Sequence, residues 1–503
     1  MAMKSNGFSS RSARHSELLR HAARVLTAAS FILAAAACDS VLDDDDDSMH
    51  IRVVNLVEDS PTLEFRFGET VVASAGYAAA SAFIASPTGS QQVQLATVAP
   101  PRINVTEVGH ETDDDNDKSA LIGTAVSRSF EANVDYLMFA VGKVEAPQFM
   151  FVEKGQWRDT VANDKIVVQL INAMPDSQPL DVYVTAPEAG VTTPQHIGTL
   201  TYSQATTPQE FTLKKQTDQA DSVTLYADLT VEVRPVGSTT PLHKTKANRI
   251  NEQSRATFVI MKNAQPGPSP VDLLLLGDTP VRLADPNNTA ELRFTHVSRD
   301  TPALDLFPGS NLQTPLAQNI AFRGASPYVS VGAGEVNLIA TPTSTPGTFV
   351  FIEEFAASLG GSYSAYAVGP LAKVDATVLA DDRRSVATQS RYRFFHTAQS
   401  LDNDDVLDIY LTEHNKPLTF DTDGDDKNES PLPEAADLPY GGASGYTSVL
   451  PGSYDIYVTY GDDSKILLGP VPLDLAKGSN QTLVLTNAED GSLTFIPFED
   501  AKR

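Results

Sequence analysis

Short stretches in which apolar and polar residues alternate recur along the chain after residue 48. Examples are Leu63–Phe67, Leu180–Val184 and Leu407–Leu411, each rich in aromatic or β-branched residues. Alternation with a period of two predicts strands with one buried face. Further strands of this half-buried kind are predicted at Tyr136–Gly142 and Tyr363–Gly369. No segment after the N-terminal region has the periodicity of an amphipathic helix, so the pattern predicts an all-β protein.

The strand pattern repeats four times. Each repeat begins with a strand, a loop and a second strand, followed by a Tyr/Ser segment and further alternating strands entered through Gly or Pro. About seven short strands in roughly 100 residues are typical of an immunoglobulin-like β-sandwich. We therefore predict four tandem sandwiches, at residues 50–160, 165–284, 290–382 and 390–503. Residues 285–289 and 380–385 are interpreted as short polar linkers, and units so close together predict a semi-rigid string. The four opening segments are Ile51–Asp59 with Leu63–Phe67, Val168–Asp176 with Leu180–Val184, Leu292–Asp300 with Leu304–Phe307, and Tyr392–His396 with Leu407–Leu411.

These repeats carry a family resemblance. The pattern Arg-Val/Phe-x-His/Asn, then Asp, then Leu-Asp-Val/Ile-Tyr, then a Tyr/Ser segment and a Gly-led strand, resembles domain-of-unknown-function family 4397. The second, third and fourth repeats match it best, whereas the first has Glu64 where the others have Asp. The resemblance implies repeated extracytoplasmic β-sandwich modules of bacterial envelopes, and it implies no particular activity.

The composition narrows the classes of partner. The chain of 503 residues has a formal net charge of -27 and one cysteine. Nucleic-acid binding needs a positively charged surface, so we expect no nucleic-acid partner. A single cysteine excludes an internal disulfide and a cysteine-rich zinc site.

The N-terminal region predicts the compartment. Basic residues up to Arg24 precede the apolar run Val25–Ala37, which is too short to span a bilayer. We interpret residues 1–37 as a signal peptide. The sequence Ala35-Ala36-Ala37-Cys38 resembles a bacterial lipobox, which implies that Cys38 is lipidated and that membrane lipid is a partner. The predicted location is the cell envelope, lipid-anchored, at the periplasmic face or the cell surface.

Residues 38–49 are predicted to be an acidic tether. Five consecutive aspartates, Asp43–Asp47, repel one another and favour an extended, solvated segment. The alternative interpretation is a surface-export signal, which such a run resembles in some bacterial lineages.

Two polar columns recur in the four repeats. The first contains Asn55, Asn172, His296 and His396, and the second contains Glu64, Asp181, Asp305 and Asp408. A histidine held by a carboxylate would suit general-base catalysis. Asparagine cannot accept a proton there, yet it donates a hydrogen bond as neutral histidine does. We therefore interpret the columns as a structural lock across the first hairpin of each repeat.

Two acidic loops have carboxylates at alternate positions, a spacing that suits a hard cation such as Ca²⁺. Both fail the EF-hand pattern, because neither has Gly at its sixth position or Glu at its twelfth. A solvated acidic loop and a calcium site both remain open interpretations, and we expect no other cofactor. The loop positions are Asp113, Asp115 and Asp117, and Asp421, Asp423 and Asp425.

Catalytic signatures are absent from the sequence. There is no nucleophile elbow, phosphate-binding loop, dinucleotide fingerprint or metalloprotease helix. We predict a protein that is not an enzyme and that serves as a spacer, adhesion or interaction array, with an envelope protein or surface polysaccharide as partner. The alternatives are a surface glycan-binding module, with calcium as an aid, and a hydrolase built on loop insertions.

Overall fold

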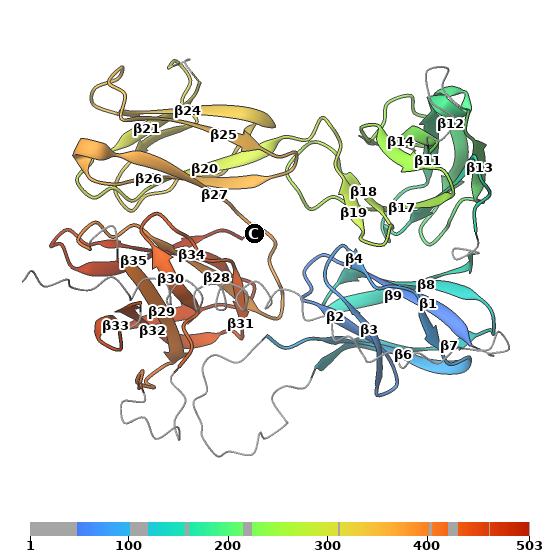
Figure 1. Cartoon of the computed structure of the whole chain (residues 1–503), viewed down its shortest axis with the longest axis horizontal. Helices are drawn as coiled ribbons and strands as arrows, with labels where there is room; N and C mark the ends of the chain where they lie inside the picture. Colours follow the sequence, from blue (N-terminus) through green and yellow to red (C-terminus); the bar gives the residue numbers. More distant parts are fainter. Residues whose placement is uncertain are drawn as a thin grey trace, which may run out of the picture. The chain divides into compact units, whose positions relative to one another are not determined.

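The computed structural model describes residues 48–100, 119–155, 160–214, 224–309, 312–401, 405–420, 431–461 and 463–501. Residues 48–503 form one compact unit. Within the described ranges the chain is almost entirely β-structure, with two short 3₁₀ turns, η1 (Pro187–Ala189) and η2 (Leu371–Lys373). This agrees with the all-β prediction. We number the four repeats as copies 1 to 4 and give their strands below (Figure 1).

In the described part of copy 1 there are nine strands in two sheets. The first sheet has the order β4-β1-β8-β9, with β5 also paired to β1, and the second has the order β3-β2-β6-β7. The strands are β1 (Met49–Val57), β2 (Leu63–Phe67), β3 (Thr70–Ala75), β4 (Ala79–Ala80), β5 (Ile84–Ser86), β6 (Gly89–Thr97), β7 (Ala120–Phe130), β8 (Asp135–Lys143) and β9 (Ala146–Gly155).

Copy 2 repeats this arrangement. Its first sheet has the order β13-β10-β17-β18-β19, and its second sheet has the order β12-β11-β14-β15, with β16 also paired to β14. The strands are β10 (Lys165–Asn172), β11 (Leu180–Ala186), β12 (Val191–Leu200), β13 (Gln209–Thr212), β14 (Tyr226–Pro235), β15 (His243–Lys244), β16 (Asn248–Asn251), β17 (Ser254–Lys262), β18 (Val271–Leu275) and β19 (Val281–Leu283).

Copies 3 and 4 are the most regular, with four strands in every sheet. Copy 3 has the orders β23-β20-β26-β27 and β22-β21-β24-β25, and copy 4 has the orders β31-β28-β34-β35 and β30-β29-β32-β33. The strands of copy 3 are β20 (Ala290–His296), β21 (Leu304–Pro308), β22 (Ala317–Ile320), β23 (Val329–Val331), β24 (Gly334–Pro342), β25 (Phe351–Ala357), β26 (Ser362–Val368) and β27 (Asp375–Ala380). Those of copy 4 are β28 (Ser390–His396), β29 (Val406–Glu413), β30 (Ala435–Pro439), β31 (Thr447–Val449), β32 (Gly452–Tyr460), β33 (Ile466–Leu475), β34 (Asn480–Asn487) and β35 (Leu493–Glu499).

The first two strands of every copy lie in different sheets. The first strand pairs in parallel with a later strand of its own sheet, as β20 does with β26 and β28 with β34. The second strand belongs to the other sheet. The expected first hairpin is therefore wrong, because the connection crosses from one sheet of the sandwich to the other. Side chains between the two sheets form one apolar core in each copy.

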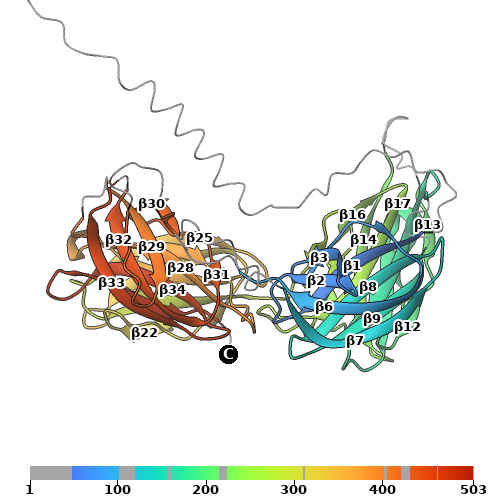
Figure 2. The ribbon, with the colours of Figure 1, turned by 90° about the horizontal axis from the view of Figure 1, so that it is seen from below.

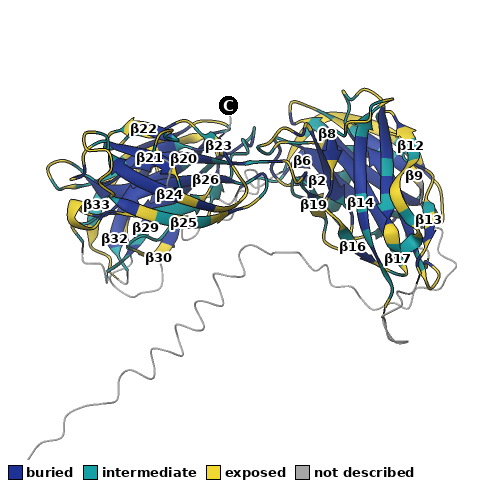
Figure 3. Ribbon diagram, turned by 90° about the horizontal axis from the view of Figure 1, so that it is seen from above, coloured by how far each residue is buried: buried dark blue, intermediate teal, exposed yellow. Residues whose placement is uncertain are grey.

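The copies also pack against each other in pairs, and two further apolar clusters show where. One joins the first sheets of copies 1 and 2 and includes Phe139, Val259 and Leu274. The other joins the first sheets of copies 3 and 4 and includes Tyr366 and Phe395. We call these contacts seam 1–2 and seam 3–4. They cover the second face of the first sheets, so strands such as β8 and β26 are buried at nearly every position and not only at alternate ones (Figure 3).

The expected string of copies joined only by polar linkers is therefore not what the structure contains. The segment 380–385, interpreted as a linker, places Asp381 with its side chain fully buried at seam 3–4. Figure 2 gives a second view of the same strands, turned by 90°.

Candidate functional site at the seams between paired copies

The Asn/His column holds the loop that follows the first strand of each copy. The Oδ1 atoms of Asn55 and Asn172 accept the backbone N–H two residues further on, both at 3.0 Å. In copies 3 and 4 the Nδ1 atoms of His296 and His396 accept the corresponding N–H at 3.3 Å. The rings therefore carry no proton on Nδ1. Burial lowers the pKa of His296, and it lowers the pKa of His396 to about 4.

The acidic column lies on the second strand and serves other loops. The Oδ1 atom of Asp305 accepts the N–H of Asn319 at 2.6 Å, and that of Asp408 accepts the N–H of Asp437 at 2.8 Å. In copy 2, Asp181 accepts the N–H of Gly237 at 3.1 Å. Glu64 instead pairs with Arg66 at 3.0 Å. The two columns thus lie on different sheets of each sandwich, and in copies 2, 3 and 4 the acidic residue orders a different loop from the one held by the Asn/His column.

One cluster of a histidine, a carboxylate and a hydroxyl was not foreseen. His196 Nε2 lies 3.3 Å from Asp181 Oδ1, and Thr199 Oγ1 lies 2.5 Å from the same oxygen and 3.5 Å from His196 Nε2. A catalytic triad needs its histidine to contact the carboxylate and the nucleophile through different nitrogens. Here one nitrogen faces both groups, so the cluster does not form a triad. His196 was not foreseen from the sequence because this residue, on β12, is not at a position that repeats in the other copies.

Several predicted residues lie outside the described residues. These are Cys38, the tether aspartates, and both acidic loops with Asp113, Asp115, Asp117, Asp421, Asp423 and Asp425. Among the residues that are described, no group of three or more His, Cys, Asp or Glu side chains is placed to hold a metal ion. No helix in the same part of the chain is long and apolar enough to cross a membrane.

The most elaborate polar arrangement of the described residues lies in seam 3–4 and begins at Arg293 on β20. Its side chain is only 4% exposed. Arg293 donates to Ser364 Oγ of its own copy at 2.8 Å, and across the seam to Asp500 Oδ1 at 2.5 Å and the carbonyl of Glu499 at 2.8 Å. The guanidinium of copy 3 is therefore neutralised by the end of copy 4.

Arg393 of copy 4 makes the corresponding contacts to copy 3. Arg393 on β28 donates to Thr482 Oγ1 of its own copy at 2.8 Å. Across the seam it donates to the carbonyl of Ala380 at 2.6 Å and forms an ion pair with Asp381. Each copy thus supplies an arginine from its first strand and an aspartate from the end of its last strand, so the seam has reciprocal contacts like those of a twofold interface.

Each aspartate is also bound by hydroxyls of its own copy. Asp381 accepts from Tyr328 at 2.8 Å and Ser364 at 2.6 Å. Asp500 accepts from Tyr446 and Thr482 at 2.8 and 2.6 Å. Burial raises the pKa of both tyrosines, so they remain protonated donors. Every carboxylate oxygen of the network has a donor, which is what a buried charge requires.

Seam 1–2 contains only part of this network. The strand register places Arg52 and Gln169 where copies 3 and 4 have Arg293 and Arg393, and Leu137 where copy 3 has Ser364. Arg52 donates to the carbonyls of Ser81 at 2.7 Å and Gly277 at 2.5 Å. Asp278, which comes after β18 as Asp500 comes after β35, is exposed.

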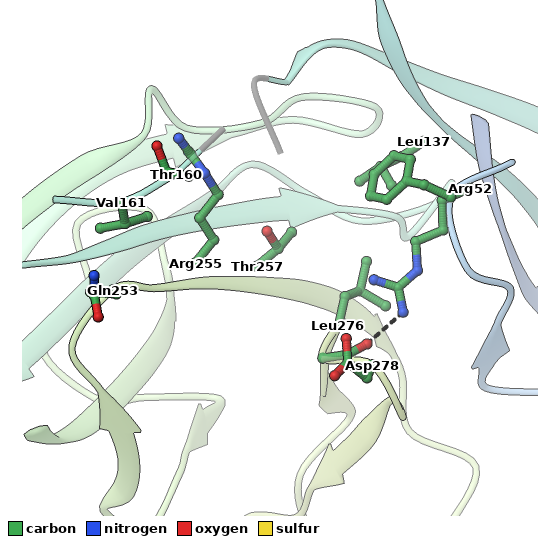
Figure 4. Close-up of a pocket in the computed structure, with 11 residues that line it drawn as sticks. Arg52, Leu137, Thr160, Val161, Gln253, Arg255, Thr257, Leu276 and Asp278 are labelled. Carbon is green, nitrogen blue, oxygen red and sulfur yellow. Dashed lines mark hydrogen bonds between the residues drawn. The ribbon is translucent and has the colours of Figure 1, made fainter. Parts of the chain in front are cut away.

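A cavity of about 300 Å³ lies beside Arg52 in seam 1–2. A second, of about 430 Å³, borders Glu58 at the same seam, and a third, of about 450 Å³, borders Arg282 and Arg383. The first cavity combines buried polar groups with an apolar wall (Figure 4).

The arginines and the Tyr/Ser segment of the network were visible in the sequence as parts of the repeat. Asp381 and Asp500 were not, because each lies just beyond a last strand and one of them was assigned to a linker. Both aspartates occupy the same place in the repeat, directly after the fifth strand that follows the Tyr/Ser segment, and this correspondence is the signal that would have identified them.

Comparison with known proteins places the chain in a family. The model of DUF4397, described as a domain of unknown function, matches residues 49–183, 166–307, 309–407 and 421–503. The chain therefore belongs to this family and contains four copies of its domain, as the sequence pattern predicted. No curated protein matches the chain.

Solved structures match at low identity. The Bacillus anthracis TIE protein is 9% identical, with a TM-score of 0.15, over 87% of this chain and 67% of that one. A putative adhesin from Bacteroides ovatus is 9% identical, with a TM-score of 0.14, over 49% of this chain and 99% of that one. The major pilin subunit of Bacillus cereus is 10% identical, with a TM-score of 0.14, over 64% and 98%. At these scores the structures carry no argument about function.

Proposed function

We propose that the protein is a non-catalytic interaction scaffold of the bacterial cell envelope, anchored through lipid on Cys38. The observation that carries this proposal is the pairing of the copies at two seams. Buried apolar clusters and, in seam 3–4, reciprocal ion pairs join sandwiches that would otherwise be separate modules. Such contacts hold neighbouring copies in a fixed arrangement, which is the property a scaffold needs.

Contacts between the two pairs support the same view. Arg384 donates to the carbonyl of Ser60 at 2.6 Å, and its guanidinium lies 5.3 Å from the ring of Tyr77. The N–H of Ala387 donates to the carbonyl of Asp59 at 2.7 Å. The segment between copies 3 and 4 is thus bound to copy 1, so no copy is left as an independent module.

The side chains that catalysis would use have structural roles in the described part of the chain. His296 and His396 each accept a backbone N–H, and the buried aspartates of seam 3–4 are neutralised by arginine. Ser444 accepts the N–H of Phe394 at 2.9 Å and donates to the carbonyl of Gly445 at 3.0 Å, as a turn residue does. These assignments favour a binding or spacing role over a hydrolase.

Glycan binding receives less support. Sugars are bound by exposed aromatic rings, and Phe349, at 55% exposed, is the one large exposed apolar side chain with a ring among the residues described. A single ring on one loop does not form a stacking platform. We therefore place an envelope protein ahead of a surface polysaccharide as the partner.

The proposal is tested in two steps. In detergent partitioning, the wild type should enter the detergent phase and Cys38→Ala should stay in the aqueous phase; equal partitioning would contradict the lipid anchor. Isolated envelopes are then incubated with the purified full chain, with and without calcium. An envelope protein that is recovered bound to the purified chain, with its own mass unchanged, supports a scaffold. Release of cleaved envelope polymer would contradict a non-catalytic role.

A further inference from the structure

The residues that bind the carboxylate of Asp500 in seam 3–4 show what a carboxylate site in this fold looks like. The carboxylate of Asp500 is fully buried and lies between Arg293, which donates at 2.5 Å, and Thr482, which donates at 2.6 Å. A carboxylate bound by a guanidinium and a hydroxyl makes strong, charge-assisted hydrogen bonds because water is excluded.

Seam 1–2 has an arginine and a threonine at the positions of the two residues that donate to Asp500. Arg293 pairs in register with Ser364, and Arg52 occupies the corresponding position opposite Leu137. In the partner copies, Arg393 pairs in register with Thr482, and Gln169 pairs with Thr257. Arg52 and Thr257 of seam 1–2 are therefore the counterparts of Arg293 and Thr482.

The carboxylate itself is absent from this position in seam 1–2. Asp278, which comes after β18 as Asp500 comes after β35, is exposed, and Arg52 donates to the carbonyl of the preceding Gly277, as Arg293 does to that of Glu499. The space is the cavity of about 300 Å³, lined by Arg52, Thr257 and Asp278. Figure 4 shows Arg52 extending toward the loop of Asp278 along the wall of this cavity.

The side chains beside this cavity are more apolar than those at the corresponding positions of seam 3–4. Leu137 stands where Ser364 binds the network of seam 3–4. Ser81 and Ser326 correspond to each other, because the hydroxyl of each accepts a backbone N–H of the first strand of its copy. Phe83 and Tyr328 lie two residues after these serines, so Phe83 occupies the position from which Tyr328 donates to Asp381. With Leu276, these side chains form an apolar wall opposite the polar groups.

Arg293 and Arg393 each form a buried ion pair with an aspartate, whereas the hydrogen bonds seen for Arg52 within the described residues go to two carbonyl oxygens. Arg52 itself is 8% exposed. Burial lowers the pKa of Arg52, with Asp278 opposing. The pKa of Arg293 is raised above its usual value despite burial, by Tyr366 and Tyr328 and then by Asp500 and Asp381. A carboxylate in the cavity would supply the missing charge.

We propose that this cavity binds a carboxylate-bearing ligand of about the size of an amino acid. Its carboxylate would accept from Arg52 and Thr257, and its aliphatic part would lie against Phe83, Leu137 and Leu276. The site does not depend on the proposed scaffold role or on the anchor at Cys38.

The other cavities fit this chemistry less well. In the second, Lys143 and Lys262 both contact Glu58, so an acidic group is already in place. In the third, Arg383 contacts Glu291 at 2.5 Å. Of the three cavities described, the first has a buried arginine whose hydrogen bonds go to carbonyls.

The test is an isothermal titration of the purified full chain with N-acetyl-aspartate amide, which has one carboxylate. The isosteric N-acetyl-asparagine amide is the uncharged control, and butyrate represents a free small acid. We expect saturable binding of the aspartate probe with a Kd of about 1 mM or below, and none of the asparagine probe. If butyrate binds equally well, the natural ligand is a free acid; if only the capped aspartate binds, it is an acidic side chain of another chain.

Variants assign the binding to the cavity. Arg52→Gln should weaken the aspartate probe at least tenfold, and Thr257→Val should weaken it several-fold. Asp278→Asn should leave binding unchanged or tighten it, because a competing carboxylate is removed. Lys262→Gln, at the second cavity, is the matched control and should bind as the wild type does. No saturable binding up to about 10 mM, or full binding by Arg52→Gln, would overturn the proposal.

Discussion

Seams 1–2 and 3–4 join the same sheets of the same fold, yet they differ in how they treat buried charge. In seam 3–4 each copy gives an arginine and an aspartate, and every charge has a partner across the seam. In seam 1–2 one arginine has become Gln169, and Arg52 binds carbonyls. Apolar clusters of similar kind occur in both. Apolar burial is therefore sufficient to pair two copies, and the ionic network is an addition that only one pair carries.

The comparison teaches what such a network contributes. Two buried ion pairs add little net stability, because desolvation of the charges offsets their attraction. They do penalise any arrangement that separates the partners, since an unpaired buried charge is costly. We infer that seam 3–4 is fixed in a single register by its network, whereas seam 1–2 is left with room for a cavity.

The largest expected change in the free energy of unfolding comes from replacing Arg393 of copy 4 by glutamine, the residue type of Gln169 in copy 2. Arg393→Gln leaves the buried carboxylate of Asp381 without its ion pair, so we expect a loss of about 3–5 kcal/mol. Arg52→Gln, the same change in seam 1–2, should cost only about 1 kcal/mol, because its partners are carbonyl oxygens.

Hydrogen exchange measured by mass spectrometry reports both pairs of copies in one experiment. Arg393→Gln should lower protection in β20, β26, β28 and β34 by about a hundredfold or more. Equal losses for the two variants would contradict the difference between the seams.

A smaller effect concerns acid stability and His396. Its pKa is about 4 in the folded protein and about 6.5 when exposed, so the unfolded chain binds the extra proton first. Stability is therefore full above pH ~6.5, falls as the pH drops toward ~4 and is level below, with a total loss of about 3 kcal/mol at most. His396→Asn, the residue type of copies 1 and 2, should remove this slope from copy 4. Urea unfolding at several pH values checks it, and an unchanged slope would show that His396 is not the group responsible.

The smallest effect is expected at Tyr366. This side chain is fully buried in seam 3–4, with its ring 4.9 Å from Phe395, and its hydroxyl has no hydrogen-bond partner among the described residues. Copy 1 has Phe139 at the corresponding register position. Tyr366→Phe should therefore be neutral or stabilise by up to about 1 kcal/mol. A loss above about 1 kcal/mol in thermal unfolding would mean that the hydroxyl is bound.

The fold was predictable because the local signals agree with each other. Alternation in Leu63–Phe67 and its counterparts marks strands that are half buried, and repetition of the pattern identifies the copies. The seams were not predicted, because strands such as Tyr136–Gly142 were expected to be buried on one face only. A strand that is buried on both faces needs a second layer of protein, and the sequence does not say that the layer is the next copy.

The site was harder to predict for a similar reason. Arg293 and Arg393 belong to the repeated pattern, but their partners are supplied by the other copy, 207 and 12 residues away in sequence. Periodicity reports contacts within a strand or sheet and carries no information on pairing between sandwiches. Asp381 followed a strand and preceded basic residues, which is typical of a solvated linker, and only the packing of copy 4 buries it.

The most direct test of the pairing is a double-mutant cycle between Arg293 and Asp500, which belong to different copies. Unfolding free energies of pair 3–4 are measured for the wild type, Arg293→Met, Asp500→Ala and the double variant. If the copies pair as described, the two substitutions should couple by about 2 kcal/mol or more, because either one alone leaves an unpaired buried charge. Additive effects, with a coupling below about 0.5 kcal/mol, would contradict the seam.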